Sequence, residues 1–465
     1  MQQRIFMLLP IAALLGACSM APKYERPPLP VPGQVGSGAE AAAASVPGWQ
    51  DYFADPSLRT LIEQALENNR DLRIAVARIE EARALYGVTR ADRLPTLAAG
   101  AGMQAGRTPG TLTPDGTAQT SRRYDVNLGI TAFEVDFWGR VKSLSDAARN
   151  QYLATEEAQR AMRATLIADV ANAYWNARAF DERAELAGKT AKSLEESAKV
   201  IDRRLDAGLA NRLDALQAGV AVDEARVSQA DLERQARNAR NALQVLTGAP
   251  AMLPAAAASL VTTLPQTRVP DGLSSTVLLD RPDVRQAEYA LQAANANIGA
   301  ARAAFFPRVT LTGSAGTAGA QLSDLFDGGS RAWSFVPQIS LPIFDAGRNR
   351  ANLDLAEARK VIAVAEYERA VQVAFREVAN VLSDQQGLQE YMVAQERVVA
   401  RQGERLKAAQ ARYDAGLVGY LDVLEAQRAQ LAAQQSLIDA ARARLAVTAE
   451  AFKALGGDEP PRNDN

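Results

Sequence analysis

The sequence of 465 residues contains no histidine and only one cysteine. The absence of histidine removes the commonest general base and the commonest metal ligand of proteins. A single cysteine excludes an intrachain disulfide and a cysteine-built metal site. Carboxylates and lysines remain, but these two absences argue against an enzyme. We expect no catalytic residue, no cofactor and no metal.

Aromatic residues and net charge are also low. Aromatics make up 6% of the chain, and 52 Lys and Arg nearly balance 54 Asp and Glu. A chain without an excess of positive charge is not expected to bind nucleic acid. Few aromatics together with abundant alanine are typical of long, closely packed helices.

Long apolar runs are missing beyond the N-terminus, so we expect no transmembrane helix. Residues 1–17 are typical of a secretory signal peptide, because Arg4 precedes a short apolar run from Ile5 to Leu15. The run ends in Leu15-Gly16-Ala17-Cys18, which resembles the lipobox of bacterial lipoproteins. That resemblance implies that Cys18 is lipidated and becomes the mature N-terminus. Ser19 after it implies sorting to the outer membrane.

Residues 18–57 follow as a lipidated N-terminal tether. Pro22 to Pro47 is rich in Pro, Gly and Ala, and such a composition predicts an extended segment without a core of its own. Helices are expected from Leu58 to Glu67 and from Asp71 to about Arg93, where Leu94-Pro95 ends the second one.

One short segment occurs twice. DAGLANRLDAL (206–216) returns as DAGLVGYLDVL (414–424), nearly half the chain later. Each copy stands between a long and a shorter stretch with helical spacing, and glycine after a helical run is the usual left-handed cap. We therefore predict two helical hairpins with tips at 206–214 and 414–422, and an internal duplication of the whole chain.

The helical stretches predicted beside these tips are long. They cover 140–205 and 348–413, about 100 Å each at 1.5 Å per residue, with return limbs at 211–246 and 420–455. The second return limb carries two lines of apolar residues, each spaced by seven and on nearly opposite faces. The lines are Leu424, Leu431, Ile438, Leu445, Phe452 and Ala426, Ala433, Ala440, Val447, Ala454. Two opposed stripes predict neighbours on both sides, as in a helical cylinder, whereas a dimeric coiled coil needs one stripe.

Strand patterns occur before each long helix. From Tyr124 to Ile130 every second residue is apolar, and Thr96 to Met103 is a weaker partner across a loop from Arg107 to Ser121. Val309 to Gly316 and Trp333 to Ile343 repeat this arrangement in the second half. The pattern fits a soluble antiparallel sheet as well as membrane strands. The signal peptide and lipobox favour an outer-membrane barrel.

The number of strands then limits the assembly. The chain supplies four, whereas the smallest membrane barrels use about eight and an open edge cannot face lipid. Two chains would give a barrel of about eight strands, whose interior is filled by its own side chains. Three chains would give a barrel of about twelve strands, which is wide enough to leave a lumen. A conduit therefore needs at least three chains.

Similar motifs connect the strands to the long helices. They are Asp136-Phe137-Trp138-Gly139-Arg140 and Asp345-Ala346-Gly347-Arg348, so we select Asp136, Gly139, Arg140, Asp345, Gly347 and Arg348 as barrel-to-helix joins.

The order of the motifs along the chain, from the lipobox to the second long hairpin, resembles that of the TolC-like outer-membrane efflux factors, and most of all their lipidated OprM/NodT-type branch. The resemblance covers essentially the whole chain. It is carried by Cys18-Ser19, 49–61 (WQDYFADPSLRTL), Pro95, Pro307, 133–141 (FEVDFWGRV), 279–284 (LDRPDV) and 412–427 (RYDAGLVGYLDVLEAQ).

The resemblance implies a mainly α fold with transmembrane β structure: a homotrimer with a 12-stranded outer-membrane β-barrel, four strands per chain, continued by a 12-helix periplasmic α-barrel. It implies a periplasmic membrane-fusion adaptor and an inner-membrane transporter of the resistance-nodulation-division class as partners, besides outer-membrane lipid. The expected segments are 1–17 signal, 18–57 tether, 58–94 helices, 95–137 barrel hairpin, 138–248 long hairpin, 249–276 linker, 277–306 helices, 307–344 barrel hairpin, 345–456 long hairpin and 457–465 tail.

Two groups of functional residues are expected at the tips. Gly208, Leu209, Gly416 and Leu417 lie farthest from the strands, where an adaptor can dock. Leu421 and Glu425 are four apart on one helical face, and the matching family motif implies that such a pair lines the closed periplasmic mouth. Tyr413 and Arg412 are placed to tie the hairpin to its neighbour, with Asp206, Asp214 and Asp422 as alternative acceptors for Arg412.

Two other functions remain open at this point. One is a non-pore coiled-coil structural lipoprotein, which would need neither the strands nor the joins. The other is a TolC-like export channel for a type I secretion system, which keeps the duct and changes the pump. The lipobox favours drug efflux over protein secretion.

Overall fold

The computed structural model describes residues 19–36, 47–250, 259–263 and 269–457. The predicted signal peptide and Cys18 lie outside the described residues. The chain divides into two compact units. The sheet unit comprises residues up to 27, 78–156 and 286–367, and the hairpin unit comprises 28–77, 157–285 and the residues from 368 onward.

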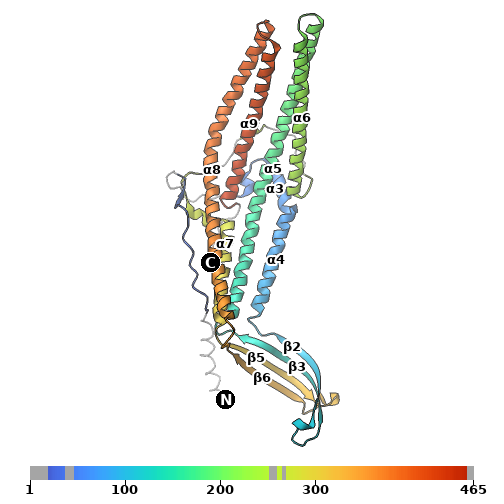
Figure 1. Ribbon diagram of the computed structural model, residues 1–465, viewed down its shortest axis with the longest axis vertical. Helices are drawn as coiled ribbons and strands as arrows, with labels where there is room; N and C mark the ends of the chain where they lie inside the picture. The colour runs from blue at the N-terminus through green and yellow to red at the C-terminus, as the bar shows by residue number, and fades with distance from the viewer. Residues whose placement is uncertain (1–18, 37–46, 251–258, 264–268, 458–465) are drawn as a thin grey trace. The chain divides into compact units, whose positions relative to one another are not determined.

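Four antiparallel strands form the sheet of the sheet unit (Figure 1). They are β2 (Leu97–Thr108), β3 (Gln119–Val135), β5 (Arg308–Gly319) and β6 (Arg331–Ser340), in the order β2-β3-β5-β6. The two predicted hairpins are confirmed. The loop predicted at 107–121 is wrong in its bounds, because pairing continues to Thr108 opposite Gln119. Among the described strands, β2 and β6 each leave one edge unpaired.

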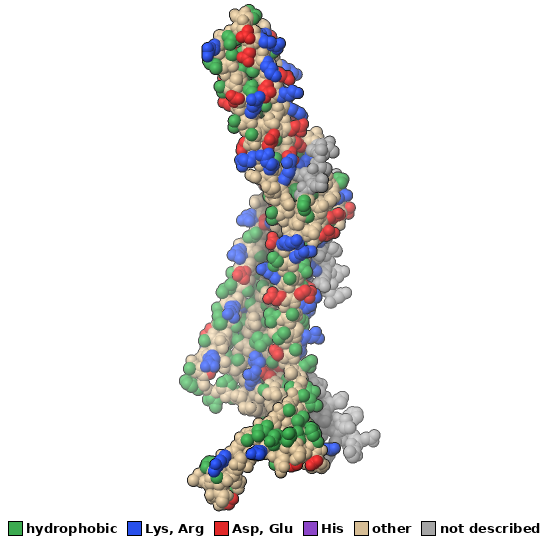
Figure 2. Space-filling view, turned by 90° about the vertical axis from the view of Figure 1, so that its right-hand side faces the viewer, with side chains coloured by type: hydrophobic (Ala, Val, Ile, Leu, Met, Phe, Trp, Pro, Cys, Tyr) green, Lys and Arg blue, Asp and Glu red, His purple; other side chains and the backbone are tan. Residues whose placement is uncertain are grey.

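The register places apolar side chains on one face of this sheet. Leu97, Ile130, Gly313 and Phe335 form one cross-strand row, and Ala99, Leu128, Ala315 and Trp333 form the next. Trp333 is 80% exposed and Phe335 61% exposed; Figure 2 shows hydrophobic side chains gathered over the sheet. The other face is polar, and on it the hydroxyls of Ser314 and Ser334 lie 2.8 Å apart. The predicted alternation of apolar and polar faces is confirmed.

A β-bulge preserves this alternation along β3. The register shifts between Ile130 and Phe133, and Ala132 has a positive φ of 51°. The extra residue brings Phe133 opposite Leu311, on the same apolar face as Ile130. The N–H of Ala132 donates to the Oγ1 of Thr312 at 3.1 Å.

The helices agree with the predicted ones to within a few residues. They are α2 (Trp49–Tyr52), α3 (Pro56–Asn68), α4 (Arg70–Ala91), α5 (Arg140–Asp206), α6 (Arg212–Thr247), α7 (Pro282–Ala303), α8 (Arg348–Asp414) and α9 (Tyr420–Ala454). In Figure 1 the pairs α5–α6 and α8–α9 form two long antiparallel hairpins. Short elements complete the described chain: β1 (Gln34–Val35), which pairs with β4 (Leu273–Ser274), and the short 3₁₀ helices η1 (Gly110–Leu112), η2 (Leu260–Thr262), η3 (Ser275–Asp280) and η4 (Leu322–Asp324). No described helix has an apolar stretch long enough to cross a bilayer.

The end of the predicted tether (18–57), beyond its stretch from Pro22 to Pro47, is packed against the hairpins. In the hairpin unit, Trp49, Tyr52 and Phe53 belong to the main hydrophobic core. The Tyr52 hydroxyl donates to the carbonyl of Thr448 at 2.9 Å, and the rings of Tyr52 and Phe452 lie 5.1 Å apart. A Pro- and Gly-rich stretch forms little structure alone, but the three aromatics that follow it gain enough burial to dock.

The earlier part of the same segment is docked within the sheet unit. The Asn295 side chain donates to the carbonyl of Pro22 at 2.7 Å. Tyr24 and Arg26 both donate to the carboxylate of Glu288, at 3.0 and 2.8 Å. Asn295 and Glu288 are seven residues apart on α7, so one face of that helix holds the segment that follows the predicted lipidation site.

Helix α9 buries most of both apolar lines within the hairpin unit, and Leu431 and Val447 are half-buried. Leu424, Ile438, Leu445 and Phe452 are buried, and so are Ala426, Ala433, Ala440 and Ala454. Helix α6 buries only one side, which includes Ala218, Ala225, Leu232 and Ala239. On its opposite side Leu213, Leu216, Val220 and Val227 are all more than half exposed. Within a single chain, α9 therefore has its neighbours and α6 lacks one.

Candidate functional site

The two tips have the same backbone geometry. The N–H of Leu209 donates to the carbonyl of Arg204 at 2.7 Å, and that of Leu417 donates to Arg412 at 2.9 Å. Gly208 and Gly416 both have φ of +72°. This is the Schellman ending of a helix, which glycine adopts without steric cost. The predicted hairpin tips are confirmed as structures, and the sequence repeat reflects one cap used twice.

The tips present bare apolar side chains. Leu209 is 78% exposed and Leu417 is 71% exposed. Both project from the loop itself, past the last helical turn, so the hairpin cannot cover them. An exposed leucine at the same position in two duplicated loops is a small apolar contact surface.

An aromatic lock joins the two hairpins just behind the tips. The rings of Tyr413 on α8 and Tyr420 on α9 lie 5.4 Å apart, and the Arg204 guanidinium of α5 lies 5.4 Å from the centre of the Tyr413 ring. Tyr420 is buried, and this burial raises the pKa of its hydroxyl. A cation over an aromatic face is attractive. The contacts of Arg204 and Tyr420 were not predicted from the sequence. The repeat gave no indication of them, because the first tip has Leu205 and Arg212 at the positions of Tyr413 and Tyr420.

The predicted ion pair of Arg412 is not formed within the described chain. Its guanidinium is exposed and pairs with none of Asp206, Asp214 and Asp422 there. Its carbonyl serves the cap instead. The contact with the first hairpin is made by Tyr413, one residue further on, because that ring faces α5.

Leu421, Asp422 and Glu425 share an exposed face in the first turns of α9. Leu421 is 47% exposed, and Asp422 and Glu425 are exposed as well. The neighbouring Val423 and Leu424 point the other way and are buried. Leu421 is therefore not part of the core of its own hairpin, and its side chain is free to meet another surface.

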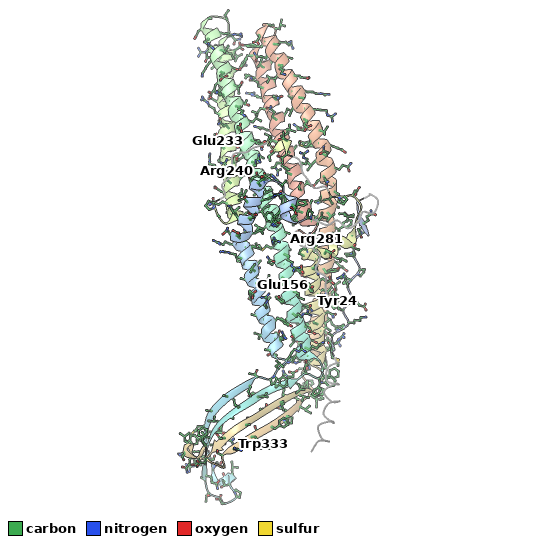
Figure 3. The ribbon with its side chains drawn as sticks, turned by 180° about the vertical axis from the view of Figure 1, so that it is seen from behind. Tyr24, Glu156, Glu233, Arg240, Arg281 and Trp333 are labelled. Atoms are coloured by element: carbon green, nitrogen blue, oxygen red, sulfur yellow. The ribbon has the colours of Figure 1, made fainter. Side chains whose placement is uncertain are left out.

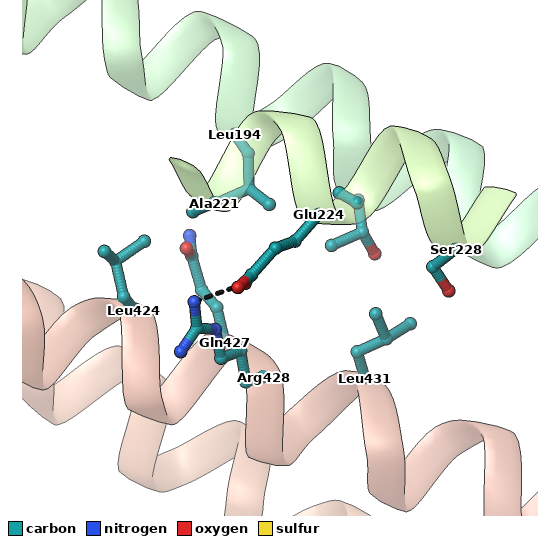
Figure 4. Close-up of a pocket in the computed structure, with 10 residues that line it drawn as sticks. Leu194, Ala221, Glu224, Ser228, Leu424, Gln427, Arg428 and Leu431 are labelled. Carbon is teal, nitrogen blue, oxygen red and sulfur yellow. Dashed lines mark hydrogen bonds and ion pairs between the residues drawn. The ribbon is translucent and has the colours of Figure 1, made fainter. Parts of the chain in front are cut away.

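A small crevice lies between the hairpins (Figure 4). It measures about 190 Å³ and is lined by Leu194 on α5, Ala221 on α6, and Leu424 and Leu431 on α9, among others. At its rim Arg428 of α9 forms an ion pair with Glu224 of α6. The walls of the crevice are mostly apolar.

The two joins between strands and long helices differ in the sheet unit. Asp136 accepts from the N–H of Lys142 at 2.7 Å, and Asp345 accepts from that of Asn349 at 2.9 Å, so both aspartates cap their helices. Gly139 and Gly347 have φ of +70° and +85°, which only glycine adopts freely.

Only the first join is fixed by charge. Arg140 donates to both carboxylate oxygens of Glu134, at 2.8 and 2.7 Å, and Arg308 binds the same carboxylate. Arg348 is exposed and has no ion pair among the described residues. The Trp138 indole donates to the carbonyl of Pro307 at 2.9 Å and thereby ties this join to the start of β5.

A buried arginine in the hairpin unit was missed. Arg281 is 2% exposed and donates to Asp283, to Glu377 of α8 at 2.6 Å and to the last carbonyl of α9, that of Ala454 (Figure 3). Burial disfavours its charge, but the two carboxylates outweigh this and raise its pKa. The motif LDRPDV contains Arg281, yet its partners lie about 100 and 170 residues away and cannot be found from local spacing.

A sheet with one bare apolar face, joined to long paired helices, defines a membrane channel subunit that contributes strands to a β-barrel and helices to a duct. The chain belongs to the outer membrane efflux protein family: the family model "Outer membrane efflux protein" matches residues 61–249 and 273–457. The predicted family, fold class and outer-membrane location are thereby confirmed, as is the predicted function as the outer-membrane channel of an efflux pump.

Named relatives cover nearly the whole chain. The chain is 44% identical to the solvent efflux pump outer membrane protein SrpC of Pseudomonas putida, over 97% of this chain and 98% of the relative. It is 42% identical to the cation efflux system protein CusC of Escherichia coli K12, over 96% and 98%.

Solved structures agree over similar lengths. A CusC structure has a TM-score of 0.86 at 42% identity, covering 95% of this chain and 100% of that one. The open state of the MtrE outer membrane channel of Neisseria gonorrhoeae has a TM-score of 0.85 at 39% identity, covering 95% and 98%. The predicted partners, a homotrimer with an adaptor and an inner-membrane transporter, agree with this family.

Proposed function

We propose that three copies of the chain form a passive exit duct for a tripartite efflux pump of the resistance-nodulation-division class. The observation that carries this proposal is the four-stranded sheet with one apolar face and two open edges. An open edge leaves unpaired N–H and C=O groups, which lipid cannot satisfy. Pairing β6 of one copy with β2 of the next closes the edges, and three copies give twelve strands around a lumen.

The helices support the same closed ring. Helix α6 leaves Leu213, Leu216, Val220 and Val227 uncovered, and α8 leaves Tyr391 and Val398 uncovered one heptad apart. In a ring of twelve helices, α6 of one copy meets α8 of the next. The exposed stripes of both helices are then buried, as a seven-residue repeat requires.

The tips serve as the docking surface for the adaptor in this proposal. Leu209 and Leu417 are exposed apolar groups on rigid caps, and they stand at the free end of the hairpins. An adaptor with complementary apolar side chains covers them on assembly.

The first turns of α9 form the gate. Three copies of Leu421 give an apolar constriction, and three copies of Glu425, one turn further along α9, give an acidic ring that favours cations. The aromatic lock between Arg204, Tyr413 and Tyr420 holds α9 in place behind them.

The duct itself does not choose the substrate. Relatives of nearly equal identity are named for solvents, toluene and cations, so the family name spans unrelated chemistries. The described residues contain no cluster of metal-ligating side chains. We assign selection to the inner-membrane transporter and no catalysis to this chain. A coiled-coil stalk leaves the paired strands unexplained, whereas a duct for protein secretion differs in its pump.

Introducing a negative charge at the tips tests the proposal. Leu209→Glu and Leu417→Glu should abolish drug efflux and crosslinked co-purification with the adaptor and transporter, while trimers and membrane insertion survive. The matched control is Leu112→Glu, a 76% exposed leucine in the loop between β2 and β3. It should leave efflux unchanged. Loss of trimers in the tip variants would instead show that these leucines serve packing.

A further inference from the structure

Three arginines stand at the loop end of the sheet. Arg107 is the last residue but one of β2, Arg122 is the fourth residue of β3, and Arg331 is the first residue of β6. All three are exposed. The long helices leave the sheet from the other ends of these strands, so in an outer-membrane channel with periplasmic helices this end faces the cell exterior.

The register places the three arginines on the apolar face. Arg122 pairs with Ala105, which is an even number of residues from Leu97 on β2, and Arg107 lies two residues beyond Ala105. Arg331 pairs with Thr317, which pairs with Val126 of the apolar rows. Side chains of directly paired residues point to the same side. The three guanidinium groups therefore face outward, toward lipid, and not into the lumen.

The apolar band ends where Arg122 and Arg107 begin, and Arg331 shares the row of Val126 just inside that end. The rows of the band run along β3 from Val135 to Tyr124, 11 residues apart with one bulge residue between. At about 3.3 Å per residue and a strand tilt of about 40°, this distance corresponds to roughly 25 Å across the membrane. That is the height of the apolar band of an outer-membrane barrel. Arg122 follows Tyr124 in the next row outward and so lies at headgroup depth.

Aromatic and charged neighbours sharpen this assignment. Trp333 lies two residues from Arg331 on the same face and is 80% exposed (Figure 3), as expected for an aromatic girdle at the membrane interface. Arg123 points to the opposite, polar face and has a carboxylate partner, Asp125, at 3.7 Å. None of the three outward arginines has an ion pair within the described residues.

We propose that Arg107, Arg122 and Arg331 form a binding site for the phosphate groups of an anionic amphiphile in the outer leaflet. Guanidinium groups bind phosphate oxygens through two parallel hydrogen bonds. Basic side chains beside an apolar membrane surface attract anionic headgroups. When β6 of one copy pairs with β2 of the next, Arg331 of one copy lies on the same outer surface as Arg107 and Arg122 of its neighbour, so the site completes itself on assembly.

Binding to the purified, unheated trimer tests this site. The probe is a glucosamine-based amphiphile with two phosphates, compared with its dephosphorylated form, and native mass spectrometry measures the amount retained. The triple variant Arg107→Gln, Arg122→Gln, Arg331→Gln should bind the phosphorylated probe about a hundredfold more weakly, since each basic side chain contributes about 1 kcal/mol at a charged membrane surface. Wild type should prefer the phosphorylated form by a similar factor.

Three controls keep the test sharp. Arg123→Gln makes the same change at the same end of the sheet but on the lumen face, and it should bind like wild type. The corresponding triple lysine variant should retain most of the affinity even if the glutamine variant forms fewer trimers. Inorganic phosphate should not displace the bound amphiphile. Unchanged binding by the triple glutamine variant, equal loss in Arg123→Gln, or displacement by free phosphate would each overturn the proposal.

Discussion

At the residue scale, a few side chains fix the tips while others remain free. Gly208 and Gly416 permit the turn, and Tyr413 and Tyr420 secure α8 to α9. Leu421 and Glu425 have no such structural duty in a single chain, because both are exposed. Side chains that the monomer does not need are the ones available to close or open a channel.

Leu421 and Glu425 give the first prediction. Leu421→Ala should raise single-channel conductance and drug leakage severalfold, because it widens an apolar constriction that water crosses poorly. Glu425→Gln should weaken cation selectivity by removing a ring of three charges. Planar bilayer recordings with ion gradients measure both effects.

The first tip provides a matched control for this gate. Leu213 occupies the position equivalent to Leu421 and is 62% exposed. Because Leu213 belongs to the stripe of α6 that the ring covers, Leu213→Ala should lower the stability of the trimer and leave the conductance of intact trimers unchanged. If Leu421→Ala and Glu425→Gln conduct like wild type but melt at lower temperature, these residues hold helices together and the gate lies elsewhere.

At the element scale, the sequence was most informative about helices. A seven-residue repeat and a duplicated cap are local patterns, so α5, α6, α8 and α9 were predicted to within about a residue of their ends. Strand ends and the bulge at Ala132 depend on pairing between β3 and β5, and the sequence of one strand does not contain that register. Arg281 and the docking of Tyr24 were missed for the same reason, because their partners lie far along the chain.

The bulge gives the second prediction. Deleting Ala132 should abolish trimer formation and membrane insertion, because Phe133 and Val135 would turn toward the lumen and Glu134 toward lipid. Glu134 would also lose Arg140 and Arg308. Unheated gel electrophoresis of outer-membrane fractions measures the trimer.

Two control variants distinguish a shift of the strand register from a general effect of changing or removing a residue. Ala132→Gly keeps the bulge and relieves its positive φ, so it should preserve the trimer and stabilise the sheet by about 1 kcal/mol. Deletion of Gly328, in the loop between β5 and β6, removes one residue without moving any strand register. Trimers that survive the loss of Ala132 would show that the two faces of β3 are not distinguished by the membrane.

At the scale of the whole molecule, one chain is incomplete. Its sheet has two open edges, and α6 and α8 each leave apolar side chains bare. A closed ring of three copies would cover both the open strand edges and the exposed apolar side chains. The need for several chains was predicted from the sequence, because four strands are too few for a membrane barrel. The structure identifies the two strand edges and the helix faces that are left uncovered in one chain.

Crosslinking of the ring gives the third prediction. Val227 lies 15 residues after Arg212 at the start of α6, and Val398 lies 16 before Asp414 at the end of α8, so both are about 23 Å from their tips. The double variant Val227→Cys, Val398→Cys should give covalently linked trimers when treated with a short thiol crosslinker. Val227→Cys with Val393→Cys, on another side of α8, should not. Equal crosslinking of both pairs would contradict the proposed neighbours.

The most direct test of the duct is a current blocked from inside the barrel. Asn127 lies on the polar face of β3 and Leu128, the next residue, on the apolar face. We predict that unheated trimers give stepwise currents in a planar bilayer, and that a polymer-linked maleimide blocks Asn127→Cys but not Leu128→Cys or wild type. The absence of current steps, or equal block of both cysteine variants, would contradict a lumen lined by the polar face.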